Sequence, residues 1–404
     1  MKKKARSDKF YRRVFLFFRP LFCLVAKIKL GVKVKHPRHF DEPVLIYSNH
    51  TTDLDFLAVS AHIKNHFYLV CSRHILAMGL LGKLIEKLFH PVAVFKGSVK
   101  GSEMIDLLRR IKRGNSVLLF CEGRLSHNGK TQPFGIAAAQ LAKAAKCKLV
   151  TFRTEGGFFL QPRWQKSINR GRLFDSGIVN EYSKEELAAM SDEELLGKIQ
   201  TDLYTDAYAE QKKRMQPLSF RGGIGEILRY YSLCPACKAT GSLSCARGSL
   251  TLSCAACGYS MRWNEYGFFE GKPSYVKTPA DWEALEQITY KERFEQGQFF
   301  SDEGVTLFAT DENFKRTPLV SGTLAGDAEK LSIAPLSFPY HELEGLEVLS
   351  GGSSLVFSRK GEHFSLPPTA ATLPNISTST SGGKITTNKL FRAPKKRCPV
   401  LEWS

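Results

Sequence analysis

Two polar stretches each follow an apolar run, and both contain side chains that could take part in chemistry. The first is "SNHTTDLDF", in which His50 stands five positions before Asp55 and shortly after the run "PVLIY". A carboxylate bonded to one imidazole nitrogen fixes the tautomer, so that the other nitrogen can take a proton from a hydroxyl group. The second stretch is "CEGRLS", residues 121–126, after the run "VLLF". The first stretch therefore predicts a general base that activates an alcohol.

The first stretch also has the form of a helix cap. Thr52-x-x-Asp55 matches a capping box, and in that interpretation His50 is only an exposed loop residue. Each helical residue turns the chain by about 100°, so His50 and Asp55 face each other only across a strand-to-helix turn. Residues 48–49 as the strand end and residues 51–52 as the helix start fit that arrangement. The sequence has no G-x-S-x-G serine, so a covalent hydrolase mechanism lacks its nucleophile.

The elements that must position these residues alternate between strand and helix from Val44 to Phe152. Five short apolar runs read as strands, and amphipathic stretches such as "DLDFLAVSAHIKN", "EMIDLLRRIKR" and "FGIAAAQLAKAAK" separate most of them. Continuous apolar strands that alternate with helices predict an α/β fold with a mainly parallel sheet covered on both faces. Sites in such sheets form at the carboxyl ends of strands. His50 and Glu122 are therefore expected to converge. The runs are "VLIYS", "FYLVC", "VAVF", "VLLF" and "LVTF".

These blocks resemble those of the glycerophospholipid acyltransferase superfamily, which includes the bacterial 1-acyl-glycerol-3-phosphate acyltransferases. "NHTTDLD" matches the Asn-His-x4-Asp block of that family, and "LLFCEGRLSHNG" is similar to its Phe-Pro-Glu-Gly block. "VTFRTEGG" is similar to the strand that follows. The resemblance covers roughly residues 30–210. Because the two main blocks occur in order, about 70 residues apart and at strand ends, the pair is far more specific than His-x4-Asp alone.

The resemblance implies a role for each residue in these blocks. It makes His50 the base that deprotonates the acceptor hydroxyl and Asp55 the residue that orients it. It assigns Glu122, Gly123 and Arg124 to the block that binds the acceptor. Arg124 would then bind the phosphate, since a guanidinium matches phosphate geometry in a bidentate manner. No cofactor is implied for catalysis.

The sequence departs from the family pattern at two places. Cys121 replaces the usual proline, which we expect to alter the stiffness of the loop rather than its chemistry. The middle block of the family, a Phe followed within three residues by Arg, is represented by "VFKGS", so Lys96 would supply the positive charge. An ordinary solvated lysine is an equally good interpretation of Lys96.

Four cysteines have the spacing of a metal site. Cys234 and Cys237, then Cys254 and Cys257, form C-x2-C-x16-C-x2-C, the pattern of a zinc ribbon. Four thiolates leave no position for water, so the predicted zinc is structural. A disulfide framework is the weaker alternative, because a convincing export signal is lacking and five other cysteines are scattered singly. Cys245, between the pairs, is interpreted as a spare.

The N-terminus combines charge with apolar residues. The chain of 404 residues has a formal net charge of +19, and residues 1–40 contain thirteen Lys or Arg against the single acid Asp8. The apolar stretch Val14–Ala26 is shorter than the roughly 20 residues needed to span a bilayer. Its mixture of aromatic, aliphatic and basic residues predicts a segment that lies in the interface of an anionic membrane. The alternative is a helix that packs on the core.

The remaining chain predicts smaller units. Residues 183–214 indicate two helices, capped by Ser183 and Ser191, and residues 300–366 alternate as short strands with turn signals. The tail is rich in Ser, Thr, Gly and Pro, which is typical of disorder. The predicted divisions are 1–35, a membrane-interface segment; 36–215, the acyltransferase domain; 228–270, the zinc ribbon; 295–366, a small β domain; and 367–404, the disordered tail.

The leading hypothesis is an O-acyltransferase of phospholipid biosynthesis. It would move a fatty acyl group from a thioester, either acyl-CoA or acyl carrier protein, to a hydroxyl of a glycerophosphate lipid, converting lysophosphatidic acid to phosphatidic acid. Glycerol 3-phosphate or another lyso-lipid are the alternative acceptors. The expected location is the cytoplasmic face of a membrane, with peripheral or monotopic attachment. A zinc-ribbon protein that binds nucleic acid is the second alternative. The strongest positive charge lies at the apolar N-terminus rather than on the ribbon, which argues against nucleic acid.

Overall fold

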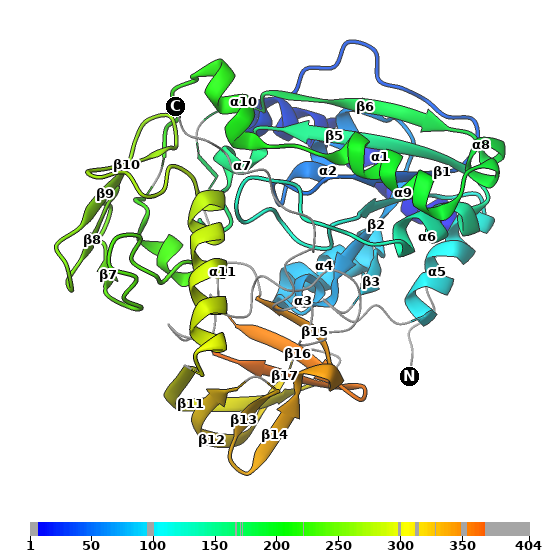
Figure 1. Cartoon of the computed structure of the whole chain (residues 1–404). Helices are drawn as coiled ribbons and strands as arrows, with labels where there is room; N and C mark the ends of the chain where they lie inside the picture. The colour runs from blue at the N-terminus through cyan, green and yellow to red at the C-terminus, as the bar shows by residue number, and fades with distance from the viewer. Residues whose placement is uncertain are drawn as a thin grey trace.

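Three sheets and the helices around them make up the described part of the chain (Figure 1). The computed structural model describes residues 7–94, 101–165, 168–169, 171, 173–220, 222–297, 300–311, 315–327, 329–348 and 354–367. Lys96, Cys398 and the predicted disordered tail beyond residue 367 lie outside the described residues, as do the first six residues of the predicted N-terminal segment. None of the described helices is both long and apolar enough to cross a bilayer.

The first sheet has six strands in the order β3-β2-β4-β1-β5-β6. The first five are parallel and β6 is antiparallel to β5, which confirms the prediction of a mainly parallel α/β sheet. β1 lies between two parallel neighbours and all five of its residues are buried. The strands are β1 Val44–Ser48, β2 Phe67–Ser72, β3 Val92–Val94, β4 Ser116–Phe120, β5 Lys148–Glu155 and β6 Asp175–Tyr182.

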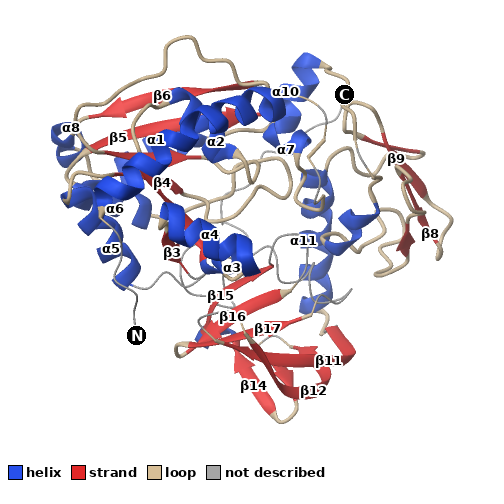
Figure 2. Cartoon of the chain, turned by 180° about the vertical axis from the view of Figure 1, so that it is seen from behind, coloured by secondary structure: helices blue, strands red, loops and turns tan. Residues whose placement is uncertain are grey.

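Helices cover both faces of this sheet. Leu45 and Tyr47 of β1 pack into a core with α5, α6 and α9, whereas Val44 and Ile46 pack into a second core with α1, η1 and α2. Alternate strand residues point to opposite faces, so a continuous apolar run supplies both cores. Figure 2 views the molecule from the side of α1 and α2. These helices are α1 Asp8–Val25, η1 Ala26–Leu30, α2 Asp55–His62, α5 Gly101–Lys112, α6 Ala137–Ala145 and α9 Asp192–Leu203.

Two local expectations about helices were wrong. α2 begins at Asp55 rather than at residues 51–52, because the side chain of Asp55 binds the backbone of the preceding turn. Residues 184–214 form three helices rather than two, since Asp206 caps a third helix through the amides of Tyr208 and Ala209. The predicted caps Ser183 and Ser191 are both confirmed. The shorter helices are α3 Arg73–Leu76, α4 Gly79–Phe89, α7 Gly157–Leu160, α8 Lys184–Ala189 and α10 Ala207–Arg214.

The second sheet follows the short helix η2, Gly225–Arg229, and one of the four paired cysteines, Cys254, ends its strand β8. Its order is β10-β9-β8-β7 and every pairing is antiparallel. Trp263 packs edge-on against Trp164, with ring centroids 5.7 Å apart, so the core of this sheet is continuous with the chain around α7. The strands are β7 Leu243–Ser244, β8 Thr251–Cys254, β9 Ser260–Trp263 and β10 Phe269–Gly271.

A helix, α11 (Pro279–Glu295), connects this sheet to the third one (Figure 1). Its start is fixed by a capping box between Thr278 and Asp281 and by Pro279 in the first turn. The third sheet has seven antiparallel strands in the order β14-β13-β12-β11-β17-β16-β15, and β11 and β12 are each 11 residues long, against the short strands expected. Its strands are β11 Phe300–Thr310, β12 Arg316–Gly326, β13 Lys330–Ile333, β14 Leu336–Pro339, β15 Leu343–Val348, β16 Leu355–Arg359 and β17 Glu362–Leu366, with the 3-10 helix η3 Tyr340–Glu342 between β14 and β15.

Candidate active site

The fold brings His50 and Asp55 together at the carboxyl end of β1. His50 Nδ1 lies 3.2 Å from Asp55 Oδ2, and the imidazole stacks on the ring of Phe120, the last residue of β4, with centroids 4.1 Å apart. Asp55 is fully buried, whereas a fifth of the His50 side chain is exposed. The ring can therefore receive a substrate from one side while its carboxylate partner stays out of contact with water.

The Asp55 carboxylate is held by far more than the histidine. Oδ2 also accepts the backbone N–H of Thr51 at 2.5 Å and of Thr52 at 3.0 Å. Oδ1 accepts the hydroxyl groups of both threonines, each at 3.0 Å. The acid thus reaches back to the turn as a capping-box acid does, but Thr52 Oγ1 accepts from Leu54 N rather than from Asp55 N. The same Asp55 carboxylate therefore binds the turn before the helix and contacts His50. The interpretation as a helix cap and the interpretation as a partner of the histidine do not exclude each other.

Glu122 connects the two polar stretches. Its Oε1 accepts the backbone N–H of His50 at 2.7 Å, and its Oε2 accepts that of Gln132 at 2.5 Å. Burial raises the pKa of Glu122 to about 8, opposed by these two N–H groups and by the charge of Arg124, while the charge of Asp55 raises it further. Both oxygens accept backbone N–H groups, so Glu122 ties the turn at His50 to the segment around Gln132.

The loop that carries Arg124 is tied down on both sides. Gly123 adopts a positive φ of 64° in the turn after β4, a conformation that favours glycine. Ser126 N donates to the His50 carbonyl at 3.0 Å, and the buried Arg163 donates from Nη1 to the Leu125 carbonyl at 2.9 Å. Arg124 itself is half-buried, and its charge contributes to the lowered pKa of Glu283 and opposes the raised pKa of Glu122.

Beyond Arg124, this loop meets helix α11. His127 Nε2 lies 3.0 Å from Glu283 Oε1, and Asn128 Nδ2 donates to Glu283 Oε2 at 2.6 Å. Burial would raise the pKa of Glu283, but the charge of His127, the hydrogen bonds from His127 and Asn128 and the charge of Arg124 hold it below its ordinary value. The acid is therefore an ionised partner of the loop, which favours a fixed loop conformation.

Several of these residues were not predicted from the sequence. Asn49 is fully buried and clamps β1 to β5, since its Nδ2 donates to the Thr154 carbonyl and its Oδ1 accepts from Thr154 N, both at 2.8 Å. Its place next to His50 was the available signal. The sequence contains no signal for Glu283, because this residue contacts the loop from 155 residues further along the chain. The predicted partner Lys96 lies outside the described residues.

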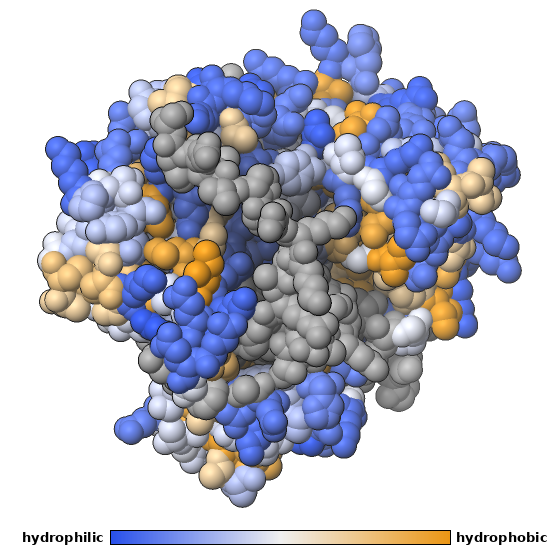
Figure 3. Space-filling model, viewed as in Figure 1, coloured by the Kyte–Doolittle hydropathy of each residue, from blue (hydrophilic) through white to orange (hydrophobic). Residues whose placement is uncertain are grey.

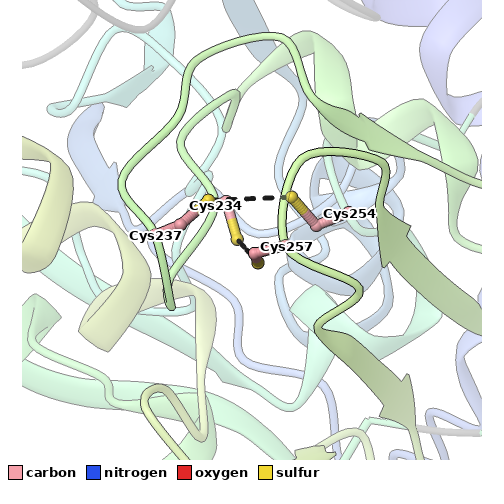
Figure 4. Close-up of side chains that lie close together, drawn as sticks. All are labelled: Cys234, Cys237, Cys254 and Cys257. Atoms are coloured by element: carbon pink, nitrogen blue, oxygen red, sulfur yellow. Dashed lines mark hydrogen bonds between the residues drawn. The ribbon is translucent and has the colours of Figure 1, made fainter.

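The four paired cysteines form a second candidate site (Figure 4). Their sulfur atoms all lie within 4.8 Å of one another, and Cys234–Cys257 and Cys237–Cys254 are each 3.8 Å apart. A tetrahedral Zn²⁺ with Zn–S bonds of about 2.3 Å needs sulfur atoms about 3.8 Å apart. Residues with positive φ, Lys238 and Gly258, follow the two pairs and close matching turns. The arrangement can hold a metal ion of this kind.

Comparisons with known proteins give one family match and one similar structure. Residues 30–155 match the family model described as Acyltransferase. The fold is similar to the crystal structure of the 1-acyl-sn-glycerophosphate (LPA) acyltransferase PlsC from Thermotoga maritima, at 16% sequence identity and a TM-score of 0.42, with 52% of this chain and 85% of that chain covered. No curated protein sequence matches the chain. The matched segment includes His50, Asp55 and the Glu122–Arg124 block.

Proposed function

We propose that the chain acylates a lyso-glycerophospholipid, and that residues 30–155, which match the family model described as Acyltransferase, form its acyltransferase domain. The donor is a thioester of coenzyme A or of acyl carrier protein, and the acceptor is lysophosphatidic acid, which becomes phosphatidic acid. The observation that carries this proposal is the His50–Asp55 pair, in which the histidine side chain is 20% exposed and the carboxylate is fully buried.

The chemistry requires one proton to move twice. With Nδ1–H donated to Asp55, Nε2 of His50 takes the proton of the acceptor hydroxyl as its oxygen attacks the thioester carbonyl carbon. The tetrahedral intermediate then collapses, the C–S bond breaks, and the leaving thiolate receives the proton from His50. Asp55 stabilises the imidazolium between these steps. No enzyme nucleophile is needed, in agreement with the absence of a nucleophile-elbow serine.

The acceptor phosphate is assigned to Arg124. Its guanidinium stands on the loop that Glu122 and Ser126 bind to the backbone of His50, so base and cation share one frame. Two acidic neighbours, Glu122 and Glu283, already interact with its charge. A dianionic phosphate would be attracted more strongly than either carboxylate, and a guanidinium offers it two parallel N–H donors.

The lipid substrate favours attachment to a membrane surface, and α1 supports it. The helix buries Tyr11 and Phe15 in the core but leaves Phe17 78% exposed. α4 lies beside it, through contacts of Phe89 with Phe18 and Phe22, and leaves Leu80 84% exposed. The other exposed apolar residues of these segments are Leu16, Leu21, Leu24, Ile28, Ile75, Met78, Leu81 and Leu84.

Exposed cations accompany these apolar residues. Lys27, Lys29 and Lys33 follow α1, and Lys83 and Lys87 belong to α4. Exposed apolar side chains and lysines on the same segments suit the interface of an anionic membrane on the cytoplasmic side. α1 and α4 face the viewer in Figure 2, and the opposite side, shown in Figure 3, carries both hydrophilic residues and hydrophobic clusters.

The paired cysteines fit a structural zinc ion, for which they would supply all four ligands. Ser242 Oγ lies 3.2 Å from Cys254 Sγ and would stabilise a thiolate there. The zinc would hold the ribbon together and take no part in acyl transfer, because the four sulfur atoms leave no coordination position for a substrate.

A substrate panel tests the proposal. Purified protein is assayed with palmitoyl-CoA and with palmitoyl acyl carrier protein, against lysophosphatidic acid, glycerol 3-phosphate and lysophosphatidylcholine, on vesicles with and without anionic lipid. We expect phosphatidic acid as the main product and faster turnover on anionic vesicles. Turnover of glycerol 3-phosphate alone would assign a different acceptor, and hydrolysis of the thioester without any acylated acceptor would refute the transferase.

A further inference from the structure

The loop after Arg124 is held from outside the acyltransferase domain. Glu283, on α11, accepts hydrogen bonds from Asn128 and faces His127 at 3.0 Å, and its side chain is only 13% exposed. The Tyr231 hydroxyl donates to the His127 carbonyl at 3.4 Å, a second contact from the chain beyond residue 215. Both contacts fall within four residues of the proposed phosphate ligand.

α11 is in turn fixed to the first cysteine turn. Glu286, one helical turn after Glu283, accepts the backbone N–H groups of Ser232 and Leu233 at 2.7 and 2.8 Å. Trp282 donates from its indole to the Leu233 carbonyl at 2.9 Å, and its ring stacks on Tyr231 with centroids 5.0 Å apart. Leu233 immediately precedes Cys234. Buried and half-buried hydrogen bonds therefore connect the residue before Cys234, through α11, to the loop that carries Arg124.

We propose that Glu283 is a positioning residue for acyl transfer: it fixes the loop that carries Arg124, so the ribbon and α11 are a working part of the acyltransferase site. The substrate contact remains with the loop, and Glu283 acts through His127 and Asn128. Two hydrogen-bonding side chains held by one ionised carboxylate lose their partner together when that carboxylate is removed.

The alternative is competition. Glu283 interacts with the charge of Arg124, so it could instead occupy the cation until phosphate arrives. The two roles predict opposite changes in KM for the phosphorylated acceptor when Glu283 is replaced. Loss of a positioning acid loosens the loop and raises KM for the phosphorylated acceptor, whereas loss of a competing acid lowers it.

The test compares wild type with Glu283→Ala and Glu283→Gln in the full-length protein. Amide hydrogen exchange is followed across residues 123–130, and KM is measured for lysophosphatidic acid and for palmitoyl-CoA. Small displacements of a binding group cost up to about a hundredfold, so for Glu283→Ala we expect about a tenfold rise in acceptor KM, with donor KM within about twofold. Amide exchange in residues 123–130 should be faster in Glu283→Ala than in wild type. Glu283→Gln keeps one hydrogen-bond acceptor, so its exchange rate and its acceptor KM should lie between those of wild type and Glu283→Ala.

Glu295→Gln is the matched control, because Glu295 lies on the same helix and, among the described residues, pairs with Lys291 in an exposed ion pair. It should change neither exchange nor KM. Asn128→Ala removes one partner from the loop side and should reproduce part of the effect even if Glu283→Ala folds poorly. Unchanged loop exchange in Glu283→Gln and Asn128→Ala would overturn the proposal, and so would a lower acceptor KM. The kinetic arm rests on the proposed function, but the exchange arm does not, so failure of one is distinguishable from failure of the other.

Discussion

The His50 site and the cysteine cluster are built in opposite ways. Around His50 the polar groups find partners within the protein: Asp55 accepts bonds from two backbone N–H groups and two hydroxyls, and Glu122 uses both of its oxygens. Around Cys234 four sulfur atoms converge within 4.8 Å of one another, and as thiolates they would repel one another without a cation between them. The first site is organised by the fold, whereas the second would be organised by its metal. Substitutions at the His50 site should thus change activity more than stability. Substitutions in the cysteine cluster should change stability more than activity.

The largest expected effect is therefore on the folding of the ribbon. Structural zinc contributes on the order of 10 kcal/mol to the folding of small zinc domains. Cys254→Ser should lose the metal, which we expect at about one zinc per chain, and should unfold residues 228–270. Elemental analysis and hydrogen exchange measure these two effects. Cys245→Ser is the control, since Cys245 lies outside the cluster; a metal-free wild type or a disulfide between Cys234 and Cys257 would refute the assignment.

His50→Ala should have the next largest effect, and on activity alone. General-base catalysis contributes about 10² to 10⁴-fold, so transfer should fall by that factor. The fold should remain, because the bonds of His50 N to Glu122 and of the His50 carbonyl to Ser126 belong to the backbone and survive in alanine. Acyl transfer and thermal unfolding are measured on the same preparation. Activity within a few-fold of wild type would make His50 an ordinary loop residue.

Arg124→Ala tests whether the His50 site binds the phosphate of the acceptor. It should reduce use of a phosphorylated acceptor by roughly 2–4 kcal/mol in transition-state terms, the scale for removing one partner of a close charge pair. Arg124→Lys should retain only part of the wild-type activity toward this acceptor, since lysine keeps the charge and loses the bidentate geometry. The kinetic constants for the thioester donor should change little. Equal impairment toward phosphorylated and phosphate-free acceptors would remove the phosphate role.

The smallest effect concerns pH and Glu122. Its pKa rises from 4.5 in the unfolded chain to about 8 in the folded one, so between these values the folded state keeps a proton that the unfolded state has lost. The stability from this group is present below pH 4.5 and is lost as the pH rises through 8, by at most about 1.4 kcal/mol per pH unit. Urea unfolding at pH 5 to 8 should therefore shift progressively in favour of Glu122→Gln over wild type. A constant difference between the two proteins would contradict it.

Whether a contact could be predicted from the sequence depends on how far apart its two residues are along the chain. His50 and Asp55 are five residues apart, and the cysteine pairs have a characteristic spacing, so local patterns identify both. Asn49 and Thr154 are 105 residues apart, and Glu283 and Asn128 are 155 apart. Neither contact produces a periodic pattern or a motif, because it depends on how the chain packs. The start of α2 was misplaced for a related reason: the carboxylate of Asp55 competes with the helix for the amides of the turn.

The most direct test compares two aspartates of one turn. Asp55 bonds His50, whereas Asp53, two residues earlier, accepts a hydrogen bond from Gln161 Nε2 at 2.8 Å and does not contact the imidazole. The measurement is the rate of acyl transfer from palmitoyl-CoA to lysophosphatidic acid by Asp55→Asn and by Asp53→Asn, each checked for wild-type folding. We predict a loss of about 10² to 10⁴-fold for Asp55→Asn and near wild-type transfer for Asp53→Asn. Equal rates in two folded variants would show that Asp55 only caps the helix, and the proton-transfer account would be wrong.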